Sequence, residues 1–245
     1  MSVLVFLLIA FTSNGHAADE RYPAFGRGTL ETRSLKALPI NKPEAKGLFR
    51  DKDVSVSWET KVFESSTVEI RYKGKLIEKI ELPGGREWSN FLGNIYYTDL
   101  DHNELPDIVL APEWYGSGLG SFDTTTDIYF QVAPGKFRRL EFTSFYFEIT
   151  DFVSSDKDGG LELLMMRLAY VNSTDGKAHS YWVYVPYKIR DFNLVIDKDF
   201  APDFPKFIWY SKKENSEPTD KLSSKVKNDF LASFPPNISS VQVSE

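Results

Sequence analysis

Apolar and polar residues alternate along the central part of the chain, beginning at Val54. Within 54–59 every second residue is apolar and the residues between them are Ser, Ser and Glu, which is the period of a half-buried strand. Residues 68–72 and 75–82 flank the dipeptide Lys73-Gly74, a hairpin signal. Runs of the same kind predict further strands over 107–111, 127–133, 136–142, 145–152, 163–170, 180–189 and 192–196.

The order of these segments repeats along the chain. Tyr, Pro, Lys and Arg occur at the same offsets in 129–138 and in 181–190, 52 residues apart, and each segment follows an acidic loop and an apolar strand. Similar units at a fixed spacing are typical of repeat folds such as β-propellers, while chance similarity between β-rich segments is the alternative. We predict an all-β, antiparallel fold of propeller-blade-like repeats over residues 54–210, as a partial propeller or a sandwich. The hairpin at 72–75 would belong to a degenerate earlier unit.

The N-terminal part of the chain lacks this pattern. Residues 3–11 form an unbroken apolar run that is too short to span a bilayer, and small residues precede Ala18, although no Lys or Arg precedes the run. We therefore expect residues 1–17 to be a signal peptide, with a buried strand as the alternative. Residues 18–53 are mixed in pattern, contain several Pro and Gly, and are predicted to be an irregular arm.

The C-terminal part, residues 211–245, is predicted to contain a polar linker, a short helix and a frayed tail. Leu222, Val226, Phe230 and Phe234 recur at steps of four, the apolar stripe of an amphipathic helix. The following pair of prolines cannot continue a helix. A role in covering the β region is the simpler interpretation of this helix, and docking to a partner is the alternative.

Composition narrows the functional classes. Aromatic residues make up 15% of the 245 residues, which favours half-buried strands. The net charge is −6. This negative charge argues against a nucleic-acid-binding protein, since such proteins present basic patches. Cysteine is absent, so disulfides, thiolate metal sites and cysteine nucleophiles are excluded. No other segment approaches transmembrane length, so we expect no integral membrane segment in the mature chain.

An acidic loop separates two apolar segments at residues 99–107. Its oxygen-bearing side chains belong to Asp99, Asp101, Asn103 and Asp107, and the carbonyl of Leu105 falls at the seventh position. Calcium prefers six to eight oxygen ligands from carboxylates, amides and carbonyls. The spacing therefore predicts a calcium site, with Ca²⁺ as the expected cofactor. The alternative is an acidic turn whose carboxylates bind backbone N–H groups.

The pattern Asp99-x-Asp101-x-Asn103-x-x-x-Asp107, followed by an apolar strand, resembles the calcium loop of FG-GAP or VCBS-type repeats. That resemblance implies a β-propeller blade of the kind found in integrin α-chains and in bacterial extracytoplasmic proteins. The family prefers Gly at the sixth position, where this chain has Glu104. If that position needs a positive φ, a side chain there is strained by roughly 1 kcal/mol or more.

A second acidic loop spans residues 154–162 and matches the same calcium-loop pattern less well. Its candidate ligands are Asp156, Asp158, Gly160 and Glu162, while Ser154 replaces the first carboxylate. Fewer carboxylates imply weaker binding.

Signals for catalysis are few. The Gly-rich run 116–120 is followed by no Lys-Ser/Thr pair, and His102 and His179 belong to no recognisable triad pattern. We therefore expect a periplasmic or secreted, non-catalytic, calcium-binding module that binds a protein or a glycan. Two alternatives remain open: a hydrolase of a cell-surface polymer that uses paired carboxylates, and a β-protein whose acidic loops no longer bind metal.

Overall fold

The computed structural model describes residues 38–39, 44–61, 66–82, 91–113, 123–145, 147–154, 161–172, 176–200, 204, 206–209 and 222–243. The expected signal peptide and the Gly-rich run 116–120 lie outside these residues. The strands are β1 (Leu38–Pro39), β2 (Glu44–Asp51), β3 (Val54–Lys61), β4 (Ser66–Tyr72), β5 (Lys75–Leu82), β6 (Phe91–Thr98), β7 (Asp107–Glu113), β8 (Asp123–Ala133), β9 (Lys136–Phe145), β10 (Phe152–Ser154), β11 (Leu161–Asn172), β12 (Ala178–Arg190), β13 (Asn193–Ile196), β14 (Lys206–Trp209), β15 (Asn237–Ile238) and β16 (Val241–Gln242). The helical elements are the 3₁₀ turn η2 (Ile149–Asp151) and the helix α2 (Ser224–Leu231).

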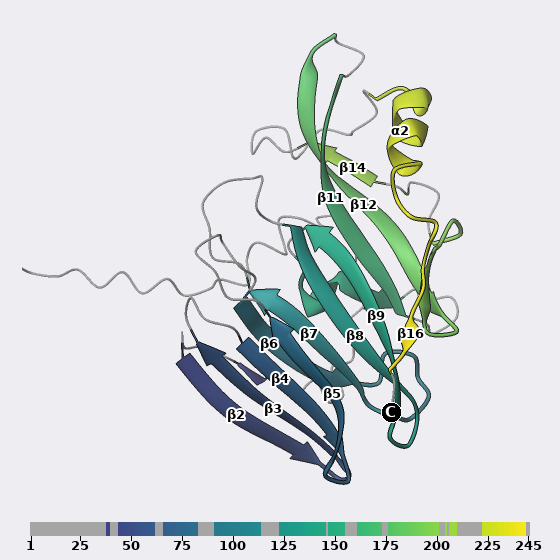
Figure 1. Cartoon of the computed structure of the whole chain (residues 1–245). Helices are drawn as coiled ribbons and strands as arrows, with labels where there is room; N and C mark the ends of the chain where they lie inside the picture. Colours follow the sequence, from purple (N-terminus) through teal and green to yellow (C-terminus); the bar gives the residue numbers. More distant parts are fainter. Residues whose placement is uncertain are drawn as a thin grey trace, which may run out of the picture.

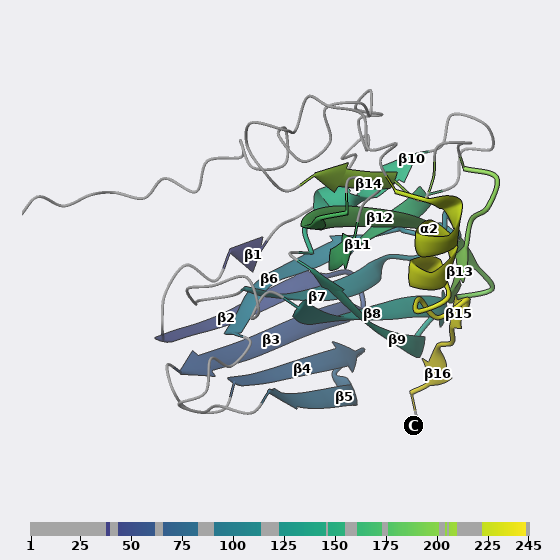
Figure 2. The same ribbon diagram turned by 90° about the horizontal axis from the view of Figure 1, so that it is seen from above.

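The strands form three antiparallel sheets (Figure 1). The first sheet has the order β2-β3-β4-β5, the second β1-β6-β7-β8-β9-β16, and the third β10-β11-β12-β13-β15, with β14 also paired to β12. Figure 2 shows them as successive layers, with the second sheet in the middle. The prediction of an all-β, antiparallel protein with a short C-terminal helix is confirmed, and the described sheets do not close into a barrel.

Each sheet is built on a meander of four consecutive strands: β2–β5, β6–β9 and β10–β13. In the second and third sheets an acidic loop connects the first strand to the second, and a tight turn connects the third to the fourth. The hairpin at 72–75 occupies the latter position in the first sheet, as expected for an earlier unit. The repetition is therefore one of strand order.

The sequence alignment of 129–138 with 181–190 does not match equivalent positions. Pro134 and Gly135 form the turn between β8 and β9, whereas Pro186 lies within β12, opposite Leu164 of β11. The corresponding turn of the third sheet is at Asp191 and Phe192. The shared Tyr, Pro, Lys and Arg residues are thus a coincidence of two β-rich segments, which was the alternative interpretation.

The second sheet is buried on both faces, because the other two sheets pack against it. Side chains that alternate along β7 enter different cores: Ile108 and Leu110 pack toward the first sheet, and Val109 and Ala111 toward the third. This explains the continuous apolar run at 108–111, which a sheet exposed on one face would not need.

Residues 44–51 form β2, so the prediction of an irregular arm over residues 18–53 is wrong for this segment. The strand pairs with β3, and Gly47 lies opposite Trp58, whose ring occupies the space that a side chain at 47 would need. The missing apolar side chain at Gly47 and the exposed Leu48 obscure the alternation that sequence analysis relies on.

The helix and tail also differ in part from expectation. The predicted stripe is confirmed: Leu222 and Phe234 are buried, and Val226 and Phe230 pack against the same core. In contrast, the tail is not frayed over residues 237–243, since β15 pairs with β13 and β16 pairs with β9.

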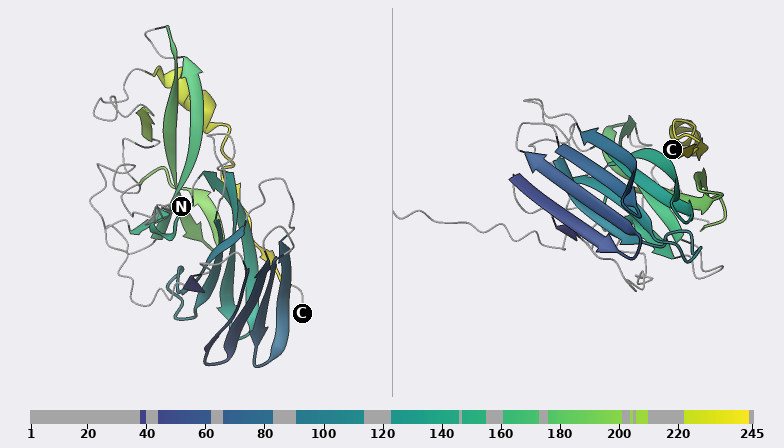
Figure 3. Two further views of the ribbon diagram at one scale, coloured as in Figure 1. Left: turned by 90° about the vertical axis from the view of Figure 1, so that its left-hand side faces the viewer. Right: turned by 60° about the horizontal axis from the view of Figure 1, so that its bottom comes forward.

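The hairpin of β11 and β12 extends past the other strands with α2 beside it (Figures 1 and 3). No helix in the described part of the chain is both long and apolar enough to cross a membrane.

Candidate metal site

The acidic loop connects the end of β6 at Thr98 to the start of β7 at Asp107. It lies at the same end of the second sheet as the turn between β8 and β9, because these strands run antiparallel. Two extended strands buried on both faces hold its ends, and the loop between them is irregular. The loop thus connects two neighbouring core strands, which hold both of its ends in place.

Asp99, Asp101 and Asn103 organise the start of the loop. Both carboxylates accept a hydrogen bond from the backbone N–H of Asn103, at 3.0 Å from Asp99 Oδ1 and 3.2 Å from Asp101 Oδ1. Asp99 Oδ2 accepts a further bond from the N–H of Glu104 at 2.9 Å. The Asn103 side-chain amide donates to Asp101 Oδ2 at 3.1 Å. These bonds, typical of Asx turns, fold the loop so that its side-chain oxygens converge.

Asp107 closes the loop and is fully buried. Its Oδ2 accepts the N–H of Leu100 at 2.8 Å, and its Oδ1 accepts the N–H of Gln131 at 2.9 Å. The Gln131 carbonyl in turn accepts the Asn103 amide at 3.0 Å. One peptide segment of β8 therefore holds both the start and the end of the loop.

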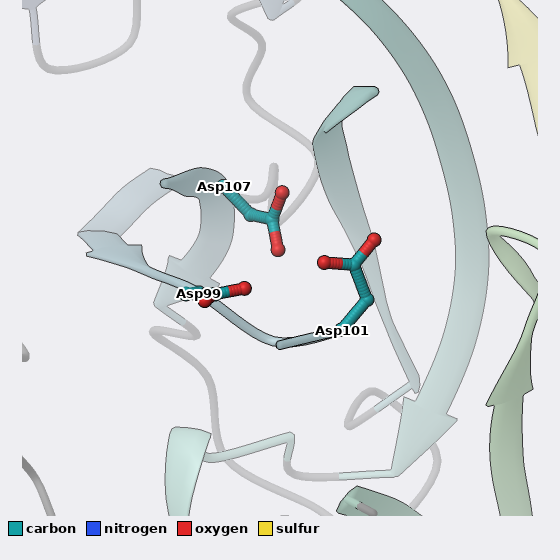
Figure 4. A group of neighbouring side chains, drawn as sticks. All are labelled: Asp99, Asp101 and Asp107. Carbon is teal, nitrogen blue, oxygen red and sulfur yellow. The ribbon is translucent and has the colours of Figure 1, made fainter. Parts of the chain in front are cut away.

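The carboxylates of Asp99, Asp101 and Asp107 point toward one another (Figure 4). One oxygen from each lies within 4.8 Å of the others, a separation that oxygens bound to a common calcium ion at about 2.4 Å can adopt. In the described part of the chain, no Lys or Arg forms an ion pair with any of the three. The donors are hard oxygens, so the residues present fit a hard cation rather than a thiophilic metal.

Burial and mutual repulsion disfavour the charged forms of these acids. Burial, with the charge of Asp99 as a further contribution, raises the pKa of Asp101 to about 6. Burial and the charge of Asp101 also raise the pKa of Asp107 well above its ordinary value, against the effect of its two backbone hydrogen bonds. A cation between them would offset the repulsion that both shifts reflect.

Two loop residues have a left-handed backbone conformation: His102 at φ 59° and Glu104 at φ 66°. The sixth position of the loop, Glu104, thus has the positive φ that was the stated condition for strain at this position. Such a conformation costs an ordinary residue roughly 1–2 kcal/mol relative to glycine. The side chain of Glu104 is exposed, and so is that of His102.

The structure therefore brings together three of the predicted first-loop ligands and places the others beside them. Asn103 contacts Asp101, and its Oδ1 accepts the N–H of Leu105 at 2.8 Å. Sequence reasoning missed Gln131, which holds the loop through its backbone. The signal available for it was a polar residue within a strongly apolar strand, where it is only 2% exposed.

The second acidic loop is described only at its end. Asp156, Asp158 and Gly160 lie outside the described residues, and Glu162 is buried in β11. Glu162 lies opposite Lys188 in the β11–β12 ladder, and the Lys188 ammonium is 3.1 Å from Asp197 Oδ1. A lysine thus already supplies positive charge beside the acids of the third sheet. Asp197 is itself buried, so it does not belong to a solvated loop.

Comparison of the chain with protein-family models, curated proteins and solved structures found no match.

Proposed function

We propose that this protein is a non-catalytic, calcium-binding β-module that works outside the cytoplasm, and that Asp99, Asp101 and Asp107 hold the ion. The observation that carries the proposal is the buried Asp107 carboxylate, grouped with two further carboxylates within 4.8 Å. Buried charges are normally paired or bound to metal. Here none of the described side chains supplies the positive charge.

The donor set favours calcium among common cations. Carboxylates, an amide oxygen and a backbone carbonyl at Leu105 suit its flexible oxygen coordination, whereas magnesium demands near-ideal octahedral geometry and retains its waters. Asn103 can contribute its amide oxygen, which already accepts one N–H and has a second lone pair. The resemblance of the loop to FG-GAP or VCBS-type repeats supports the same ion and an extracytoplasmic location.

The expected role of the ion is structural. The loop joins two central strands of the middle sheet, and Gln131 connects it to a third strand through two hydrogen bonds. Bound calcium would favour the ionised carboxylates and so stabilise this end of the sheet. The observed geometry gives no comparable support to a hydrolase, because the acids of the loop are hydrogen-bonded to backbone N–H groups and to the Asn103 amide.

Calorimetry of the full chain tests the proposal. Calcium added to chelator-treated protein should raise the melting temperature, because an ion that binds only the folded state stabilises it by about 2.7 kcal/mol at a hundredfold excess over Kd. Magnesium at the same concentration should have a smaller effect. Asp101→Ala should lose most of the response to calcium.

Glu104→Gln is the matched control. It removes one negative charge from the same loop but leaves the three grouped carboxylates in place, so its response to calcium should persist. If wild-type protein unfolds identically with calcium and with chelator, the loop is a metal-free acidic turn and the proposal is wrong.

A further inference from the structure

A cavity of about 280 Å³ opens between the edges of the first and second sheets. Its walls come from β5, from the turn that begins β9, and from the C-terminal tail; the lining residues are Lys75, Leu76, Ile77, Gly135, Lys136, Phe137, Gln242 and Val243. Its floor is the apolar core between the two sheets, since Phe137 and Val243 belong to that core and Ile77 packs against it. The cavity thus leads from the edges of the two sheets to the apolar core between them.

Two lysines line this opening. Its charged lining residues are Lys75 and Lys136, both exposed, and no Asp or Glu among the described residues lines it. Neither ammonium takes part in an ion pair with the described residues, although the protein as a whole carries a net charge of −6. An anionic group at the opening would therefore meet two uncompensated cations.

A strand edge that no other described strand covers runs beside the cavity. Among the described strands β5 pairs only with β4, so its other edge presents backbone N–H and C=O groups. The ladder shifts register where Ile70 faces Glu78 and Arg71 faces Leu76, which leaves Ile77 as the bulged residue. Exposed edges accept additional strands, and pockets beside such an edge select the side chains of an added strand.

We propose that the cavity and the edge of β5 bind an extended peptide segment of a partner protein. The segment would carry an apolar side chain between two acidic residues at alternate positions. These positions fall on one face of a strand, so the apolar side chain would enter the cavity and the acids would face Lys75 and Lys136. Such a partner would give the proposed β-module a binding role that does not depend on bound calcium. The free backbone edge favours a peptide over a small anionic molecule.

The test uses a synthetic peptide, Thr-Asp-Thr-Phe-Thr-Asp-Thr, added to the isotope-labelled full chain. Amide chemical shifts should change around Lys75–Ile77, Gly135–Phe137 and Gln242–Val243. The peptide Thr-Lys-Thr-Phe-Thr-Lys-Thr should not bind. The double variant Lys75→Glu/Lys136→Glu should weaken binding by roughly tenfold or more, since two attractive charge pairs become repulsive.

The matched control is Lys198→Glu/Lys225→Glu, which changes the net charge equally at exposed residues that neither line the cavity nor belong to β5, and it should bind as wild type does. Titrations with calcium and with chelator separate this proposal from the metal site, since binding should persist in both. The proposal is overturned if neither peptide binds, if both bind equally, if the shifts map elsewhere, or if the double variants bind alike. Self-association of the wild type that the Lys75→Glu/Lys136→Glu variant abolishes would instead assign the surface to a second copy of this chain.

Discussion

The carboxyl oxygen Oδ1 of Asp107 lies 2.9 Å from the backbone nitrogen of Gln131 and accepts its hydrogen bond, so a fully buried acid on β7 is bound to the backbone of β8. The same carboxylate accepts the N–H of Leu100 at the start of the acidic loop. A single side chain thereby satisfies two donors of the buried backbone and contributes to the group of acids. Its structural role and its proposed metal-binding role can be separated by substitution.

Asp107→Ala should destabilise the protein more than Asp99→Ala does. The first substitution leaves two N–H groups without their acceptor, one of them in a core strand, at a cost of about 1–3 kcal/mol each. Asp99 is only half-buried, so water can replace it. Urea denaturation in saturating calcium and in chelator measures both variants. Equal losses of stability would contradict the assigned role of Asp107.

Stability should depend on pH in opposite ways with and without calcium. An acid whose pKa is raised on folding adds stability that is complete below its unfolded pKa and is lost as pH rises through the folded pKa. For Asp101 that interval runs from about 4 to about 6. In chelator, the loop should therefore become more stabilising as pH falls from 7 to 5.

Calcium binding requires the ionised acids, so the increase in melting temperature that calcium produces should shrink over the same fall in pH. Melting temperatures measured with calcium and with chelator at each pH give this difference directly. If the calcium-induced increase in melting temperature stays constant between pH 5 and 7.5, Asp101 does not lose a proton when calcium binds, and the prediction is wrong.

Glu104→Gly should stabilise the protein by about 1 kcal/mol, because Glu104 has φ 66° and glycine adopts this conformation without the steric cost. Glycine also gains entropy in the unfolded chain, which reduces the benefit. Glu104→Ala is the control, since it removes the charge but keeps the Cβ. Should alanine stabilise as much as glycine, charge and not backbone strain would be the cause.

Two buried tyrosines should respond differently to the loss of their hydroxyl groups. The Tyr129 hydroxyl is buried without a hydrogen-bond partner among the described residues, whereas the Tyr187 hydroxyl donates to the Pro235 carbonyl at 2.8 Å. Tyr129→Phe should leave stability unchanged or raise it, and Tyr187→Phe should cost about 1 kcal/mol. Chemical denaturation of both variants gives the comparison. A loss at Tyr129 as large as that at Tyr187 would contradict it.

Sequence periodicity predicted most strands closely, both in the first sheet, as at 75–82, and in the middle sheet, as at 107–111. The run at 107–111 is apolar because packing partners lie on either side of it, and 163–166 is likewise buried at every position. Both strands formed where expected. The predicted strand over 145–152 instead contains η2 and the start of β10. There Asp151 accepts the N–H of Glu148 at 2.8 Å, a local bond that competes with strand pairing.

The candidate site was predictable because its acidic residues are close in sequence. Asp99, Asp101 and Asp107 belong to one loop, so their spacing alone indicates convergence. The contribution of Gln131 depends on which strand pairs with β7, and it acts through backbone atoms that every residue carries. Long-range pairing of this kind leaves little trace in a single sequence. The same holds for β15 and β16, whose few residues have no measurable periodicity.

The C-terminal segment has a consequence for how this protein folds. Arg138 of β9 binds Ser240, 102 residues later in the chain, through both its hydroxyl and its carbonyl, and Asn193 of the third sheet binds the same Ser240. Contacts of such separation carry a large loop-closure entropy and form late. Until they form, the outer edge of β9 stays open to pairing with another chain. The period of greatest aggregation risk should therefore be the interval between formation of the middle sheet and docking of residues 237–243.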